Sequence, residues 1–478
     1  MTLCLGDKLT TLVVTEDGNM SVFGNNGMGQ LGLGHQDYIE NPTLLDKLAF
    51  DSVDVVMASA GIYHSACITS TGSLWIWGRG FCGALGIAPG DNSAVPQPRL
   101  VPTQVFAQFP VLMVACGQDF TLILTRANEI WSCGDNGSGQ LGHNDTETRY
   151  LFTQIDRQLF GPGATVRMIA AGSMHSMAFT HTGDDNTLWT WGRNRNGQLG
   201  HGDKGAERPV PVAIPAATFN GQPVVFMDGG HGHTLVVTAD GSLWGCGADS
   251  YGELGLHAQL TGSDDDTDSG SDDDTDVLTM QKVVGPEFAD GQGVLMAACG
   301  YFHSVVLAKN HTVWVCGFGR NISGINTDAN CTRLLTPIDP ALFGNQKILT
   351  VAAGYYDSGV VTEHGNVWSW SAMASVGPHR RNLHTRAGRW HCPPLDHALA
   401  FAMISHDKLG AGASCYGQMF PPELMMHMFD DMYFQPHAAT PDGVRDMLGR
   451  PIPRRMIALH HDAAVVQDDL DTSAFFDS

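Results

Sequence analysis

Histidine binds metals and transfers protons, and in this chain it returns at one position of a repeated pattern. Each copy stands directly before a Ser or Thr at the start of an apolar run. The four copies are His64, His175, His233 and His303. An active site needs each catalytic group once rather than four times, and Phe120 and Asp357 occupy the same position in two further repeats. We therefore expect these histidines to make structural hydrogen bonds between repeats.

Other residues that could serve catalysis or metal binding lack the required spacing. His460, His461 and Asp462 are adjacent, so on a strand they alternate between its two faces and do not converge on one ion. The glycine-rich pieces are periodic turns without the lysine of a phosphate-binding loop, and no Gly-x-Ser-x-Gly elbow is present. The sequence predicts a protein that is not an enzyme and that holds no metal or cofactor.

Two charged clusters are the candidate partner-binding residues. An acidic tract of Asp, Ser, Thr and Gly contains Asp264, Asp265, Asp266, Asp272, Asp273 and Asp274. This composition predicts a disordered loop over 261–277, which either improves solubility or attracts a basic partner. The second cluster begins at Arg380 and Arg381 and is a candidate intramolecular target of the tract.

The histidines belong to a repeat whose end is marked by Trp-x-x-Gly or a close variant. The closing residues are Gly24, Gly78, Gly134, Gly192, Gly247, Gly317 and, in the seventh copy, Ser371. The intervals between them are 54 to 58 residues, apart from one of 70 that contains the acidic tract. An apolar run, an x-Gly turn and the Trp segment predict a hairpin, preceded by a strand of small residues. Each repeat is thus expected to be an antiparallel sheet of three or four strands.

A Gly-Gln-Leu-Gly segment or a variant of it follows most of these hairpins. Its leucines are expected to enter the core and fix the connection between repeats; they are Leu31, Leu85, Leu141, Leu199 and Leu254. The tryptophans occupy strand positions that predict core packing. The 11 cysteines, an odd number without Cys-x-x-Cys spacing, are expected to be buried thiols in a reducing compartment.

Composition limits the classes of partner. A net charge of −23 disfavours general binding to nucleic acid or anionic membranes. No apolar run approaches the ~20 residues of a membrane span, and the first repeat begins almost at the first residue, which leaves no room for a signal peptide. These features predict a soluble intracellular protein in the cytoplasm, the nucleus or both, and we expect a monomer.

The repeat length, the hairpin, Trp-x-Trp-Gly and Asn-x-x-Gly-Gln-Leu-Gly together resemble the regulator of chromosome condensation family. The resemblance implies an all-β, seven-bladed β-propeller whose seven repeats occupy residues 1–376. Beyond them, we expect a partly helical extension or insertion at 377–450 and ring-closing strands with an acidic tail at 451–478. Closing the repeats into a ring protects sheet edges.

Fold alone does not determine function. The family resembled includes an exchange factor for a small GTPase, a plant UV-B receptor, propellers within ubiquitin ligases, and scaffolds. The leading hypothesis is a non-enzymatic scaffold or adaptor that binds proteins. The alternatives are a guanine nucleotide exchange factor and a substrate adaptor of a ubiquitin ligase; the latter rests on a faint F-box-like segment, FPPELMMHMF, at 420–429.

Overall fold

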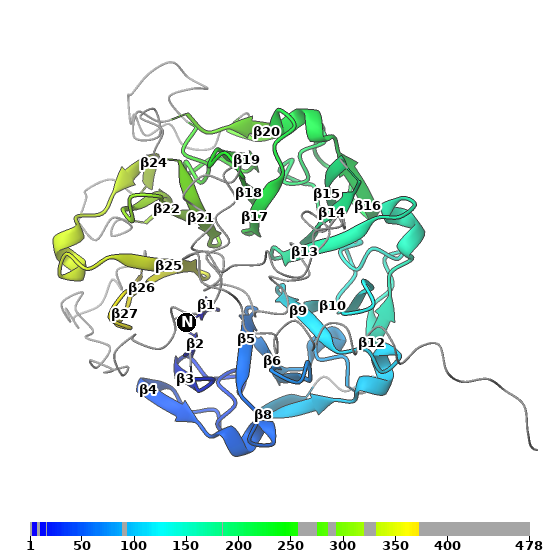
Figure 1. Cartoon of the computed structure of the whole chain (residues 1–478), viewed down its shortest axis with the longest axis vertical. Coiled ribbons are helices and arrows are strands. Elements are labelled where there is room, and N and C mark those ends of the chain that lie inside the picture. Colours follow the sequence, from blue (N-terminus) through cyan, green and yellow to red (C-terminus); the bar gives the residue numbers. More distant parts are fainter. Residues whose placement is uncertain are drawn as a thin grey trace, which may run out of the picture.

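Seven antiparallel sheets surround one axis, so the fold is the predicted seven-bladed β-propeller (Figure 1). The computed structural model describes residues 2–6, 10–15, 17–87, 93–183, 185–256, 275–284, 293–319 and 331–371. Within these ranges six blades have four strands and the seventh has three. The expected insertion at 261–277 falls almost entirely outside the described residues, and the segments at 377–450 and 451–478 fall wholly outside them.

In every blade the strands follow chain order from the axis outward. The first strands are β1 (Thr2–Leu5), β5 (Val55–Ala60), β9 (Val111–Cys116), β13 (Thr165–Ala171), β17 (Val224–Gly229), β21 (Val294–Cys299) and β25 (Ile348–Ala353). The second strands are β2 (Thr11–Val14), β6 (His64–Thr69), β10 (Phe120–Thr125), β14 (His175–Thr182), β18 (His233–Thr238), β22 (His303–Ala308) and β26 (Asp357–Thr362).

The third strands carry the Trp-x-x-Gly segments. They are β3 (Met20–Gly24), β7 (Leu74–Arg79), β11 (Ile130–Gly134), β15 (Asp185–Gly192), β19 (Leu243–Gly247), β23 (Val313–Phe318) and β27 (Val367–Ser371). The outer strands are β4 (Ile39–Leu45), β8 (Ala94–Val101), β12 (Arg149–Gln154), β16 (Arg208–Ile214), β20 (Val277–Lys282) and β24 (Cys331–Pro337). The closing glycines have φ between 102 and 113°, a left-handed conformation that side chains disfavour.

Short 3₁₀ helices join one blade to the next, and each places a phenylalanine in the core. They are η1 (Lys47–Phe50), η3 (Thr103–Phe106), η4 (Arg157–Phe160), η5 (Ala216–Phe219) and η8 (Pro340–Phe343). Their terminal rings meet the first Trp of the next blade edge to face, as in Phe50–Trp75, with ring centroids 5.7 Å apart. A further 3₁₀ turn, η2 (Phe81–Gly83), follows β7.

A buried Asn–Gln pair shapes the loop after the third strand. In blade four, Asn194 accepts the N–H of Leu199 at 3.2 Å and donates to the carbonyl of Asp203 at 3.0 Å. Gln198 accepts the N–H of Asn196 at 2.9 Å. Leu199 is fully buried, as are its equivalents Leu31, Leu85, Leu141 and Leu254, which confirms the predicted role of the Gly-Gln-Leu-Gly leucines.

This loop also binds the next blade through one backbone carbonyl. The carbonyl of Gln140 accepts hydrogen bonds from Trp191 Nε1 at 2.9 Å and Ser176 Oγ at 2.7 Å. Where a cysteine replaces the tryptophan, its thiol takes the same place, as in Cys246 Sγ to the carbonyl of Gln198 at 3.4 Å. The Trp and Cys positions of the repeat therefore fulfil one role, which is to donate to the preceding blade.

The recurring histidines link the blades a second time, as predicted. His175 Nε2 lies 2.9 Å from Thr234 Oγ1 of the next blade. Because Thr234 donates its own proton to the carbonyl of Gln198 at 2.8 Å, we infer that His175 Nε2 carries the hydrogen and donates. His64, His233 and His303 make equivalent contacts of 2.9 to 3.0 Å. The glycine three residues before each histidine is required by close packing, since a Cβ at Gly172 would lie 2.2 Å from the His175 ring.

Blade five departs from the Asn–Gln pair and buries two carboxyl groups instead. Asp249 and Glu253 occupy the Asn and Gln positions, and each side chain is 1% exposed. Asp249 accepts the N–H of Leu254 at 2.8 Å, but its Oδ2 has no partner within the described chain. Burial raises the pKa of Glu253 to about 7 and that of Asp249 well above its usual range, while Asp276 adds repulsion and Arg333 opposes it.

The first and last blades meet through their innermost strands. Leu3 and Leu5 of β1 belong to one apolar cluster with Ala352 of β25 and Val361 of β26. The N–H of Tyr355 also donates to the carbonyl of Gly6 at 3.2 Å. The ring is thus continuous within the described residues.

We predict that Glu253→Gln stabilises the protein at neutral and alkaline pH. The folded-state pKa of Glu253 lies above its ordinary value of 4.5, so its contribution to stability is complete below that pH and is lost as the pH rises to about 7. Urea titrations should show a free energy of unfolding up to about 3 kcal/mol higher for the variant near pH 8, with little difference at acidic pH. The matched variant Gln198→Glu should make blade four lose stability in the same way as the pH rises. Parallel pH profiles for the wild type and Glu253→Gln would contradict this account.

We predict that His175→Phe lowers stability modestly without disturbing the fold. Blade three already holds the fully buried Phe120 at this position, so the ring is tolerated, but the bond to Thr234 is lost. Chemical unfolding should show a loss of about 1 kcal/mol. A variant as stable as the wild type would mean that these bonds between blades add no net stability.

Candidate interaction face

The strand order brings two sets of loops to the same end of the ring. The loops between first and second strands and those after the third strands share one end, here called the loop face. The first set comprises residues 62–63, 118–119, 173–174, 231–232, 301–302 and 355–356; the second comprises 79–83, 135–138, 193–196, 248–252 and 318–319. The hairpin turns and the five linking 3₁₀ helices lie at the other end, here called the turn face.

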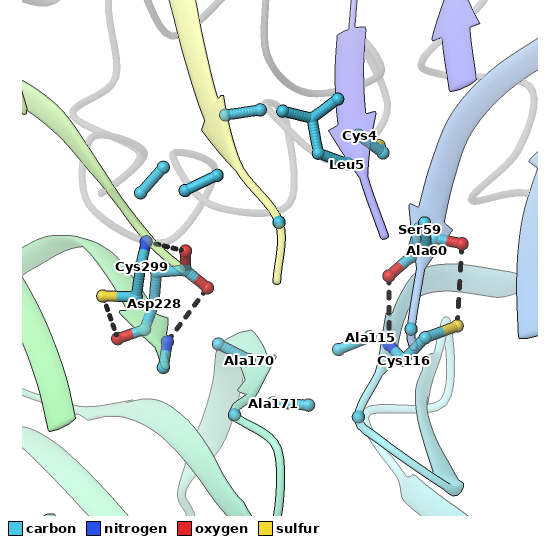
Figure 2. A pocket seen from close by; sticks show the side chains of 18 of the residues that line it. Cys4, Leu5, Ser59, Ala60, Ala115, Cys116, Ala170, Ala171, Asp228 and Cys299 are labelled. Atoms are coloured by element: carbon cyan, nitrogen blue, oxygen red, sulfur yellow. Dashed lines mark hydrogen bonds between the residues drawn. The ribbon is translucent and has the colours of Figure 1, made fainter. Parts of the chain in front are cut away.

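A central cavity of about 300 Å³ runs between the first strands. Its walls are mostly small residues, such as Ala60, Ala115 and Ala170, because seven strands converge there (Figure 2). Asp228 stands out as a carboxyl group in this apolar lining. Its Oδ2 accepts the N–H of Cys299 at 2.8 Å, and its Oδ1 accepts the N–H of Gly229 at 2.9 Å.

Asp228 acts as a link between neighbouring first strands. Ser59 does the same elsewhere in the ring, since its Oγ accepts the N–H of Cys116 at 3.0 Å (Figure 2). Burial by the channel walls raises the pKa of Asp228 to about 7, against the two N–H donors that lower it. These contacts give Asp228 a structural role.

The recurring histidines do not form an active site. All four side chains are at most 1% exposed, and burial lowers their pKa values, to about 3 for His175 and His233 and about 4 for His64 and His303. They are therefore neutral at physiological pH, and their Nε2 atoms are engaged between blades. Among the described residues, no group of three or more His, Cys, Asp or Glu side chains is placed to hold a metal ion.

The described cysteines are free thiols, and most are buried. Burial raises the pKa of Cys4 and Cys116 to about 12, so these thiols stay protonated and weakly nucleophilic. This agrees with the prediction of buried cysteines. Cys67 behaves alike, with a pKa raised well above the ordinary value by burial.

Aromatic rings gather on the loop face over blades five to seven. His231 stacks on Tyr301 with centroids 3.9 Å apart, and Tyr301 meets Tyr355 at the same distance. Phe302 extends the group toward Tyr251, whose side chain is 38% exposed. Half-exposed aromatic side chains of this kind are enriched at protein interfaces.

Charged residues occupy the loop face over blades two to four. Arg79 lies between the rings of Tyr63 and Phe81, 4.3 and 4.4 Å from their centroids, and pairs with Asp119 at 3.3 Å. Arg193 and the exposed Arg195 follow β15 in blade four. The loop face thus combines aromatic and charged side chains around the mouth of the channel.

The candidate residues chosen from sequence cannot be placed relative to this surface from the described residues. Asp264, Asp265, Asp266, Asp272, Asp273, Asp274, Arg380 and Arg381 all lie outside the described residues. The loop-face aromatics were not predicted. Their signal was the pair of residues between the small-residue strand and the histidine position, which changes from repeat to repeat: Ser173-Met174 in blade four, Tyr301-Phe302 in blade six.

Comparison with known proteins identifies the family to which this architecture belongs. The model of the RCC1-like domain matches residues 2–321. The ultraviolet-B receptor UVR8 of Arabidopsis thaliana is 30% identical over 346 residues, covering 72% of this chain and 71% of the receptor. Human E3 ubiquitin-protein ligase HERC2 is 28% identical over 373 residues, which are 78% of this chain but 7% of the ligase.

A solved structure supports the same fold. Prp20p of Saccharomyces cerevisiae superposes with a TM-score of 0.61 at 23% identity, over 74% of this chain and 80% of that one. Within the described residues, the helices are too short and too polar to cross a bilayer. The seven repeats, the blade architecture and the match over residues 2–321 show that this chain belongs to the RCC1-like domain family.

Proposed function

We propose that this protein is a non-enzymatic scaffold or adaptor that binds partner proteins on its loop face. The observation that carries the proposal is the group of half-exposed aromatic rings around the channel mouth, formed by Tyr251, Phe302, Tyr301 and Tyr355. Aromatic and arginine side chains supply most of the binding energy at protein interfaces. The four recurring histidines and most of the described thiols are buried, and the histidines make structural contacts between blades.

The rigid ring beneath suits this role. Each loop begins and ends on a strand whose neighbours are fixed by bonds between blades, so the loop residues are held in place before a partner arrives. Such preorganisation reduces the entropy lost on binding. The preorganised loops therefore allow tight binding of a partner even where the interface is small.

Two narrower roles remain alternatives. The structure of Prp20p was described with its binding to Gsp1p and histones, and the family resemblance includes exchange factors for small GTPases, so exchange activity is one alternative. HERC2 is a ubiquitin ligase in which a matching segment occupies a small part of a long chain, so adaptor function in ubiquitination is the other.

We predict that Tyr251→Ala weakens partner binding, whereas Arg126→Glu on the turn face does not. Tyr251 is exposed and packs on Phe302 and Phe318, so its loss removes contact surface at the group's edge. Capture of partners by the tagged full-length chain, quantified by mass spectrometry, should fall about tenfold or more for a residue that anchors an interface. If both variants captured partners equally well, the binding surface would lie outside the loop face and the proposal would be wrong.

The same capture separates the alternatives. An exchange factor retains a small GTPase without nucleotide and releases it when GTP is added. A ligase adaptor retains ligase subunits, and GTP has no effect. Deletion of 262–276 tests the acidic tract, because a bait for basic partners loses them on deletion and a solubilising insertion does not.

A further inference from the structure

Arg193 is a half-buried cation without a carboxylate partner among the residues that the structure describes. Its backbone N–H donates to the carbonyl of Met174 at 2.9 Å, and its Nη1 contacts the sulfur of the same residue at 3.2 Å. Its Nε is buried and has no hydrogen-bond partner within the described ranges. Across the described part of the chain Arg193 forms no ion pair, and Glu207 nearby accepts instead from Ser138 at 3.0 Å.

Three other arginines near the loop face each have a carboxylate partner. Arg149 pairs with Asp145, and Arg208 pairs with Asp203 at 2.8 Å. Arg79 has both a carboxylate and two aromatic rings, as described above. Arg193 has a thioether, which is a weak acceptor. Leaving a desolvated charge unpaired is costly, so an anion at this position would be bound favourably.

The surroundings of Arg193 further disfavour its unpaired positive charge. Burial, followed by repulsion from Arg195, lowers the pKa of Arg193. His231 beside it stays neutral, because burial lowers its pKa to about 4, with a further effect from Arg193 itself. The ring of His231 is instead held in the aromatic stack, where Tyr301 Oη lies 3.2 Å from its Nε2.

We propose that Arg193 binds the carboxylate of an Asp or Glu side chain on a partner protein, and that the Tyr301–Tyr355 stack packs against an aromatic or apolar residue beside it. This rests on the proposed function and specifies the partner's chemistry. The planar fork of a guanidinium group matches a carboxylate through two parallel hydrogen bonds. Arg195, exposed next to it, draws the acidic residue toward the site.

A single carboxylate fits this site better than a polyanion. The chain has a net charge of −23, so a long run of phosphates would be repelled by the rest of the surface. One acidic side chain between aromatic residues instead uses the local positive charge and the adjacent rings together. The occupant we infer is therefore a protein segment with one Asp or Glu side chain beside an aromatic residue.

The test uses the full-length protein and two peptides that differ in one group. The probes are acetyl-Tyr-Glu-Tyr-amide and acetyl-Tyr-Gln-Tyr-amide, which have the same shape but differ in charge. Binding is followed through the arginine Nε–H signals in nitrogen-15 NMR spectra, and the Arg193 signal is assigned by its absence in Arg193→Lys. The turn-face variant Arg126→Gln is the matched control.

We expect the Glu peptide to shift the Arg193 signal saturably and to bind about tenfold or more tightly than the Gln peptide. Arg193→Gln should lose this preference, Arg193→Lys should keep only part of it because a point charge lacks the fork, and Arg126→Gln should bind like the wild type. Equal binding of the two peptides would overturn the proposal. So would an Arg126→Gln variant that loses the preference for the Glu peptide as fully as Arg193→Gln does.

The outcome for Arg193 is separable from that for the scaffold. If Arg193→Gln captures partners as well as the wild type while Tyr251→Ala does not, the loop face binds proteins but the carboxylate site is wrong. If neither substitution affects capture and the Glu peptide still binds at Arg193, the site exists and the proposed function of the loop face fails.

Discussion

In blades one to five, one backbone carbonyl in the loop after the third strand links each blade to the next. In blade three this is the carbonyl of Gln140, which accepts from Trp191 and Ser176 of the next blade. The loop presents the carbonyl correctly because the Asn and Gln side chains satisfy its own backbone groups from within. A propeller blade contacts only its neighbours, so its stability is a sum of blade and interface contributions. The recurring polar residues are therefore as structural as the apolar ones.

This dependence explains which features could be predicted. A residue that fulfils the same role in each blade appears at a fixed spacing, so the sheets, the buried leucines and the histidine contacts followed from the repeat. The phenylalanines that end the 3₁₀ helices also recur, for example Phe50 and Phe106, each 25 residues before the Trp it packs on. The repeat pattern did not predict them because they lie in the linkers between the hairpins rather than within the hairpins.

The interaction surface could not be predicted in the same way. Arg193, His231 and Tyr301 come from different blades and meet only because the ring places their loops side by side. Their spacing in the sequence carries no sign of this proximity. The most visible non-repeat features of the sequence are the acidic tract and the arginine pair, which lie outside the described residues. In a repeat protein, positions whose residue differs from repeat to repeat are a better guide to the binding surface. The residues that recur in every repeat are already explained by their structural role.

The junction between β1 and the seventh blade has a consequence for how the molecule forms. Neighbouring strands within a blade are close in sequence, so each hairpin can assemble early and with little loss of chain entropy. Leu3 and Leu5, however, pack against β25 and β26, which belong to the last described blade. This contact has the longest possible sequence separation in the ring, and such non-local contacts slow folding. During synthesis the apolar residues of β1 that face the seventh blade stay uncovered until the chain has been made through that blade.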